Sequence, residues 1–203
     1  MHVELVWATP NLKETIIKIA RVSNPNNQGN DERLLNYLIQ HSHWSPFEMA
    51  SVCLSIKTTR DIGRQILRHR SFHFQEFSQR YAEVIDVPEL FKARRQDTKN
   101  RQNSIDDMSQ DTQTDAYEIQ ENVYKLTNIS YKNLLDMGVA KEQARKILPE
   151  GITPTHMYMV GTVRDWYHYC RLRTGNGTQL EHQEVALDCQ KILNGLLPEV
   201  FKA

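Results

Sequence analysis

Residues 50–70 read ASVCLSIKTTRDIGRQILRHR, and a change of periodicity within this stretch indicates the class of fold. In its first part apolar residues alternate with polar or smaller ones, as in a half-buried strand; they are Ala50, Val52, Leu54 and Ile56. Thr58 or Thr59 can then cap a helix that we expect to run to about Arg70, because its apolar residues recur at helical spacing. A strand that leads directly into a helix suggests that both kinds of element share one core.

The same two patterns recur on either side of this stretch. Strands are predicted at residues 1–8 and 157–160. Helices are predicted after a cap at Asn11, ending at the turn cluster 24–27, then from Asp31, and at 117–135, 141–148, 162–172 and 179–197. The whole pattern predicts an α+β fold, a single domain over residues 1–203 with long helices packed on a small, mostly antiparallel sheet.

Residues 92–113 are almost wholly polar and interrupt this pattern. We interpret them as a mobile surface segment of the domain rather than a linker, because helical periodicity resumes directly after them. Their position and composition also suggest the hypothesis that they order over a functional site when ligands arrive.

Composition excludes several classes of function. Lys and Arg together number 25 and so do Asp and Glu, so the chain lacks the basic excess of proteins that coat nucleic acid. No apolar run approaches the roughly 20 residues that cross a bilayer, and the first residues lack a signal pattern. The three cysteines are odd in number and far apart, which favours reduced thiols and a cytoplasmic location.

Two clusters of polar groups stand close together in the sequence: Arg68-His69-Arg70 and, after seven residues, Ser78-Gln79-Arg80. Arginine's planar fork suits phosphate or a ring edge that carries carbonyls, and a serine hydroxyl can complete such an anion site. Arg60, Arg64 and Arg68 also recur every four residues, which is ordinarily a solvated helix face. The interleaved phenylalanines leave open an RNA- or DNA-binding module, although the neutral net charge counts against it.

A metal site is the weaker interpretation of the histidines. His41 and His43 could combine with His69 and His73, but no cysteine pair or carboxylate at ligand spacing accompanies them. We therefore expect no metal.

The spacing of the two arginine clusters resembles the signature of the flavin-dependent thymidylate synthases. Three further segments are similar to that family and follow in its order: His43-Trp44-Ser45-Pro46-Phe47-Glu48, Arg145-Lys146-Ile147-Leu148-Pro149, and the stretch from Thr162 to Glu181 that holds Arg171-Leu172-Arg173 and Gln179-Leu180-Glu181. On the residues alone, Ser45-Pro46 could be a simple turn and Glu48 a surface carboxylate.

The resemblance implies two sets of site residues. The FAD set is His43, Ser45, Glu48, Arg68, His69, Arg70, Gln75, Glu76, Thr162, Arg164 and His168. The dUMP set is Gln65, Arg68, Glu76, Ser78, Gln79, Arg80, Arg145 and Arg173, with Arg173 as the catalytic residue. Thr162, Gln75 and Gln79 depart from the residues that are usual in the family.

The implied reaction is the reductive methylation of dUMP to dTMP. It would use 5,10-methylenetetrahydrofolate as carbon donor and FAD, reduced by NADPH, as hydride source. None of the three cysteines has a nucleophile's setting, so activation of uracil is expected from Arg173 stabilising the ionised ring. The family also implies a homotetramer with sites shared between subunits. The alternative within the same chemistry is a dUMP-binding flavin oxidoreductase without methyl transfer.

Overall fold

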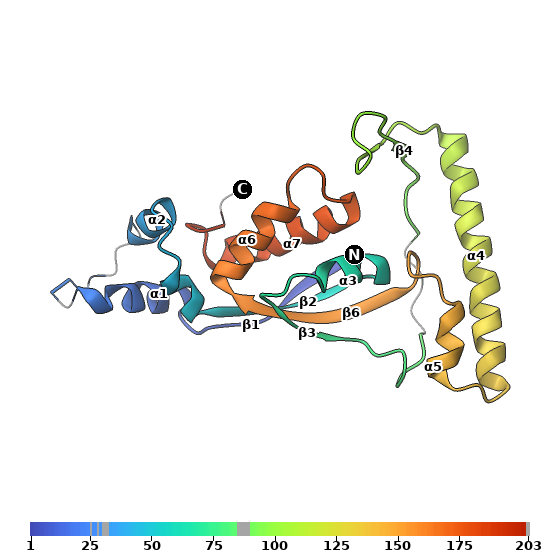
Figure 1. The fold of residues 1–203 in the computed structure, drawn as a ribbon, viewed down its shortest axis with the longest axis horizontal. Helices are drawn as coiled ribbons and strands as arrows, with labels where there is room; N and C mark the ends of the chain where they lie inside the picture. Colours follow the sequence, from blue (N-terminus) through green and yellow to red (C-terminus); the bar gives the residue numbers. More distant parts are fainter. Residues whose placement is uncertain (25, 28, 30–32, 85–89, 202–203) are drawn as a thin grey trace.

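A four-stranded antiparallel sheet forms the centre of the protein. The structure, a computed structural model, describes residues 1–24, 26–27, 29, 33–84 and 90–201. The strands are β1 (His2–Ala8), β2 (Ser51–Thr59), β3 (His73–Glu76) and β6 (Pro154–Thr162), in the order β1-β2-β6-β3 (Figure 1). Each neighbouring pair in this order is antiparallel, as predicted from the sequence.

The periodicity of β2 explains why it lies in the middle of the sheet. Val52, Leu54 and Ile56 are fully buried on one face, where they join the hydrophobic core. That face is covered by α3 (Arg60–Ile66), α6 (Val163–Arg173) and α7 (Leu180–Leu196), which lie together on one side of the sheet (Figure 1). The hydrophobic face of the strand therefore packs against helices, and its other face is left for polar residues.

The remaining helices lie at the two ends of the sheet. At one end are α1 (Leu12–Ala20), α2 (Arg33–Gln40) and a 3₁₀ turn, η2 (Ser45–Met49). At the other end stand α4 (Gln110–Asp136), α5 (Lys141–Ala144) and the 3₁₀ turn η3 (Arg145–Ile147), with α4 well apart from the sheet (Figure 1). A further 3₁₀ turn, η1 (Arg21–Ser23), follows α1. None of the described helices is long and apolar enough to cross a membrane.

The helix expected to run to about Arg70 is shorter than predicted. It ends at Ile66, and the backbone then tightens into turns that bring Phe72 into the core against Trp166, with ring centroids 4.8 Å apart. Arg68 therefore lies beyond the helix, so it does not share a helix face with Arg60 and Arg64. The chain leaves the helix because β3 must pair with β6, a long-range contact that periodicity does not reveal.

Several other boundaries differ at the level of single residues. The α4 helix begins seven residues before the predicted Tyr117, because Ser109 accepts a hydrogen bond from the Thr112 amide and caps a polar first turn. Asn11 stands at the N-cap of α1 but makes no side-chain cap bond. The expected helix start at Asp31 lies outside the described residues.

Part of the polar segment 92–113 forms a small hairpin of β4 (Arg95–Gln96) and β5 (Ser104–Ile105). Two buried side chains of α4 hold the residues before it. The Gln113 carboxamide exchanges hydrogen bonds of 2.9 and 2.7 Å with the backbone of Ala93, and Gln120 does the same with Phe91 at 2.8 and 3.0 Å. The expected mobility of this segment stays a prediction.

Candidate functional site

The turn between α3 and β3 meets the end of α6. Arg173 Nε donates to Nε2 of His69 at 3.0 Å, across 104 positions of sequence. Burial, reinforced by the Arg173 charge, lowers the pKa of His69 from 6.5 to about 4. The imidazole is therefore neutral at neutral pH, so its Nε2 lone pair can accept this bond.

A second chain of hydrogen bonds starts beside this contact. The Tyr169 hydroxyl lies 3.1 Å from Nε2 of His182, whose Nδ1 lies 3.3 Å from the Gln65 oxygen, and Gln65 Nε2 donates to Gln179 at 2.7 Å. Burial, with Arg173 next in importance, lowers the pKa of His182 to about 4. Gln65 and Arg173, both predicted nucleotide contacts, are thus linked to the same buried aromatic cluster, since the His69 and His182 rings are 6.3 Å apart.

His182 and Tyr169 were missed by the sequence-based site prediction. His182 directly follows the Gln-x-Glu segment, and it precedes the buried Val185, Ala186 and Cys189 at helical spacing. That spacing places an imidazole on the core face of α7, where a polar ring needs partners. This is the signal that could have found it.

The residues of the predicted flavin set near His43 meet the start of α6. Glu48 forms an ion pair with Arg164, and Trp44 packs on His168 with ring centroids 4.8 Å apart. Thr162 caps α6 through a reciprocal capping box with Asp165. The threonine that departs from the family's usual residue therefore has a structural role at the helix terminus. His43 and Ser45 are exposed beside this contact.

Arg68, Arg70 and Gln75 are exposed along the turn and β3. Within the described part of the chain, neither arginine has an ion-pair partner. The two arginines are two positions apart in the sequence. A pair of unpaired guanidiniums this close suits the diphosphate of a flavin dinucleotide, so these residues fit the expected cofactor.

Other predicted dUMP contacts lie at the last residue of β3 or beyond it. The Thr155 hydroxyl donates to Glu76 at 2.8 Å, and Arg60 lies 3.6 Å from the same oxygen. Ser78 accepts from the Arg80 amide at 3.4 Å, and Arg80 pairs with Glu142 of α5 at 3.5 Å. Arg145 begins η3, directly after α5.

Within one chain the predicted contacts fall into two groups. We call Gln65, His69 and Arg173 the helix-side group, and Ser78, Gln79, Arg80 and Arg145 the α5-side group. His69, which contacts Arg173, precedes β3 in the chain, whereas Ser78, Gln79 and Arg80 follow it, and the four residues of the strand span roughly 13 Å. Gln79 is buried, and its Nε2 has no hydrogen-bond partner among the described residues.

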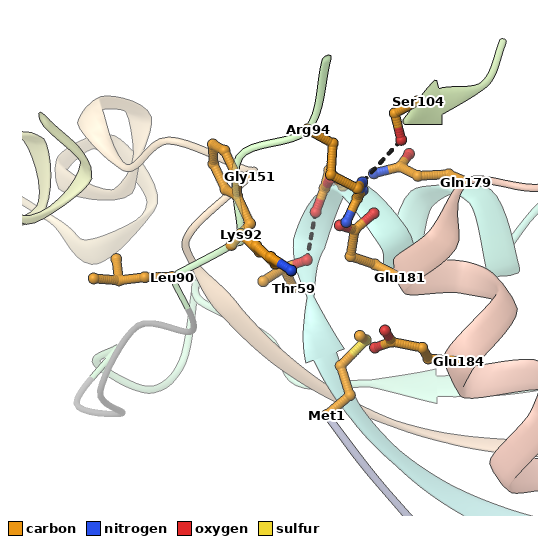
Figure 2. A pocket seen from close by; sticks show the side chains of 12 residues that line it. Met1, Thr59, Leu90, Lys92, Arg94, Ser104, Gly151, Gln179, Glu181 and Glu184 are labelled. Carbon is orange, nitrogen blue, oxygen red and sulfur yellow. Dashed lines mark hydrogen bonds and ion pairs between the residues drawn. The ribbon is translucent and has the colours of Figure 1, made fainter. Parts of the chain in front are cut away.

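A separate cavity lies between the hairpin and α7. It measures about 400 Å³ and is bordered by Thr59, Lys92, Arg94 and Gln179 (Figure 2). Arg94 pairs with Glu181 at 2.5 Å and donates to Ser104 at 2.8 Å, which ties the hairpin to α7. None of the predicted dUMP contacts lines this cavity. Gln179, which accepts a hydrogen bond from Gln65, does line it, so the hydrogen-bond chain of His182 ends at the cavity wall.

All three cysteines are buried and free. Burial raises the pKa of Cys53, raises that of Cys170 to about 12, and raises that of Cys189 well above its ordinary value. None is poised to form a thiolate near neutral pH, so a nucleophilic cysteine is disfavoured here. The described residues also contain no group of three or more His, Cys, Asp or Glu side chains that could hold a metal ion.

Comparison with known proteins places this geometry in a family. The model of the thymidylate synthase complementing protein family matches residues 4–199. A probable flavin-dependent thymidylate synthase of Paramecium bursaria Chlorella virus 1 is 52% identical, over 94% of this chain and 89% of the relative. The chain belongs to the flavin-dependent thymidylate synthases. Another member of this synthase family, from Synechocystis sp., is 48% identical over 91% of this chain and 85% of its own.

A solved structure supports the fold of this synthase. The UMP/dUMP methylase PolB from Streptomyces cacaoi, bound with 5-Br dUMP, is 28% identical and superposes with a TM-score of 0.86. The match covers 99% of this chain and 93% of PolB. The predicted α+β fold, with long helices packed on a small, mostly antiparallel sheet, is thereby confirmed.

Proposed function

We propose that this synthase converts dUMP to dTMP, with 5,10-methylenetetrahydrofolate as carbon donor and FAD reduced by NADPH. The single observation that carries the residue assignment is the contact of Arg173 with His69, which joins the arginine signature to the last family segment. The binding of 5-Br dUMP by PolB supports a uridylate as substrate. Bound reduced flavin would supply the hydride for the methyl group.

Arg173 is proposed to activate the uracil ring. Within the described residues only its Nε is engaged, so its two terminal nitrogens remain as donors for the N3–O4 edge of uracil. A fixed positive charge at that edge stabilises the ionised ring and makes C5 more nucleophilic. The three buried thiols, with their raised pKa values, support this electrostatic route over a covalent one.

The FAD is proposed to lie between the signature turn and the 43–48 segment. Arg68 and Arg70 would hold its phosphates, while Glu48, paired with Arg164, would fix the start of α6 beside it. His43, Ser45, His69, Gln75, Glu76, Thr162 and His168 complete the proposed flavin set. The separation of the helix-side and α5-side groups supports a site that takes them from different subunits.

We propose a homotetramer because the helix-side and α5-side groups are separated within one chain and because apolar side chains are exposed on the surface. Ile119, Val123 and Leu126 of α4 are 65%, 42% and 68% exposed and recur at helical spacing along one stripe. Tyr158 is 43% exposed on the face of the sheet opposite the buried Met157 and Met159. Apolar surface of this kind is typical of faces that bury themselves against another subunit. Reduced cysteines support the proposed cytoplasmic location.

The test compares Arg173→Ala with Arg171→Ala, a matched control two residues away on the same helix. The visible spectrum of each purified variant is recorded with FAD and then with dUMP, and dTMP formation is assayed with all substrates. Arg173→Ala should keep the flavin spectrum and lose dTMP formation by at least a thousandfold, whereas Arg171→Ala should stay near wild type. Near-normal turnover of Arg173→Ala would reject the assignment.

A further inference from the structure

His182 is a buried polar residue that the family segments do not account for. Its ring is fully buried, between the Tyr169 hydroxyl at 3.1 Å and the Gln65 oxygen at 3.3 Å. Both ring nitrogens are therefore engaged, one toward the core and one toward a proposed dUMP contact.

The chemistry of these groups gives the hydrogen bonds one direction. Burial raises the pKa of Tyr169 well above 10, so the phenol keeps its proton and donates it to Nε2 of His182. The neutral imidazole then carries its own proton on Nδ1 and donates it to the Gln65 oxygen. Gln65 consequently donates through its amide nitrogen, one hydrogen going to Gln179 at 2.7 Å and the second remaining for a ligand.

We propose that His182 is a positioning residue that turns the Gln65 carboxamide so that its NH₂ group faces the nucleobase, and that this orientation selects uracil over cytosine. The inference rests on the proposed function, because it takes Gln65 as a contact of the dUMP base.

The selectivity follows from what the two bases present at the same position. Uracil carries a carbonyl oxygen at C4, which accepts from an amide NH₂, whereas cytosine carries an amino group there. Arg173 offers only donors, whereas the Gln65 amide could turn to accept from that amino group. While His182 occupies the Gln65 oxygen, both Gln65 and Arg173 present only donors to a cytosine amino group, and these donors are left unpaired.

The experiment measures dissociation constants of dUMP and dCMP for the FAD-loaded protein by calorimetry. His182→Leu removes both hydrogen bonds, and His182→Asn keeps an N–H near the position of Nδ1. Cys189→Ala is the matched control, since it also empties space on the buried face of α7 but removes no hydrogen bond of the Tyr169–His182–Gln65 chain. Tyr169→Phe removes only the donor to Nε2.

His182→Leu should lower the preference for dUMP over dCMP by about tenfold or more, which corresponds to the loss of one hydrogen bond. It should also raise KM for dUMP more than it lowers kcat. His182→Asn should restore most of the preference, and Cys189→Ala should leave it unchanged. An unchanged preference in His182→Leu, or an equal loss in Cys189→Ala, overturns the inference. Should His182→Leu fail to fold, an unchanged preference in Tyr169→Phe overturns it. Failure of the wild type to bind dUMP would instead reject the proposed function.

Discussion

At the scale of single residues, two uncharged imidazoles make the stability of the fold sensitive to acid. The unfolded chain protonates histidine near pH 6.5, but His69 and His182 take up a proton only at about pH 4 when folded. Between these values the unfolded chain binds more protons. The free energy of unfolding should therefore fall as pH falls through this window, by up to about 1.4 kcal/mol per pH unit for each histidine.

The prediction is checked by urea unfolding at pH 7 and pH 5 and at fixed protein concentration. The free energy of unfolding of the wild type should be lower at pH 5 than at pH 7. Fully buried His182 should contribute the larger part of this difference, because solvent screens half-buried His69. His182→Asn should show a shallower loss. Cys189→Ala should be less stable at both pH values, but its free energy of unfolding should fall between pH 7 and pH 5 by as much as that of the wild type. A fall in Cys189→Ala as small as that in His182→Asn would contradict the explanation.

The roles of single residues were only partly predictable from the sequence. Family resemblance singled out Arg173 and His69, and the structure joins them, although no local pattern connects residues so far apart. It did not reveal His182, because that residue lies outside the family segments; only its helical spacing with buried Val185, Ala186 and Cys189 indicates that its ring is buried and needs partners. The proposed ligand contacts of the other site residues stay predictions.

At the scale of elements, α4 holds the start of the hairpin segment through two glutamine side chains. Gln120→Ala removes both hydrogen bonds to Phe91, so the amide of Phe91 should exchange with solvent roughly ten- to a hundredfold faster. Hydrogen exchange read by mass spectrometry on a peptide spanning residues 90–94 measures this. The exposed Asn122→Ala, two positions along the same helix, should leave the rate unchanged. Equal rates in both variants would show that the glutamine does not hold the segment.

Elements with their own periodicity were predictable, and those defined by long-range pairing were not. Alternation identified β2, and helical spacing identified α6 and α7, because each buries one face of its own. The short β3 was missed, since pairing with β6 rather than its own side chains makes it a strand. The β4–β5 hairpin is equally short and polar, so no hydrophobic pattern indicates it.

At the scale of the whole molecule, the apolar stripe on α4 predicts how assembly can be broken. Leu126→Lys places a charge in a stripe that we expect to be buried between subunits, so the proposed tetramer should dissociate into smaller species. Glu121→Lys adds a lysine roughly 140° around the same helix and should leave the assembly intact. Size-exclusion chromatography with light scattering distinguishes these outcomes. A tetrameric Leu126→Lys would place the subunit contacts elsewhere.

The separation of the helix-side and α5-side groups along β3 has a genetic consequence. If each site draws Arg173 from one subunit and Arg80 from another, a defect in either residue harms different halves of the same site. Two inactive chains, one Arg173→Ala and one Arg80→Ala, should then complement each other when co-expressed, because random mixing leaves about a quarter of the sites with both arginines. If the co-expressed chains are active although each variant alone is inactive, each active site is built from residues of two subunits.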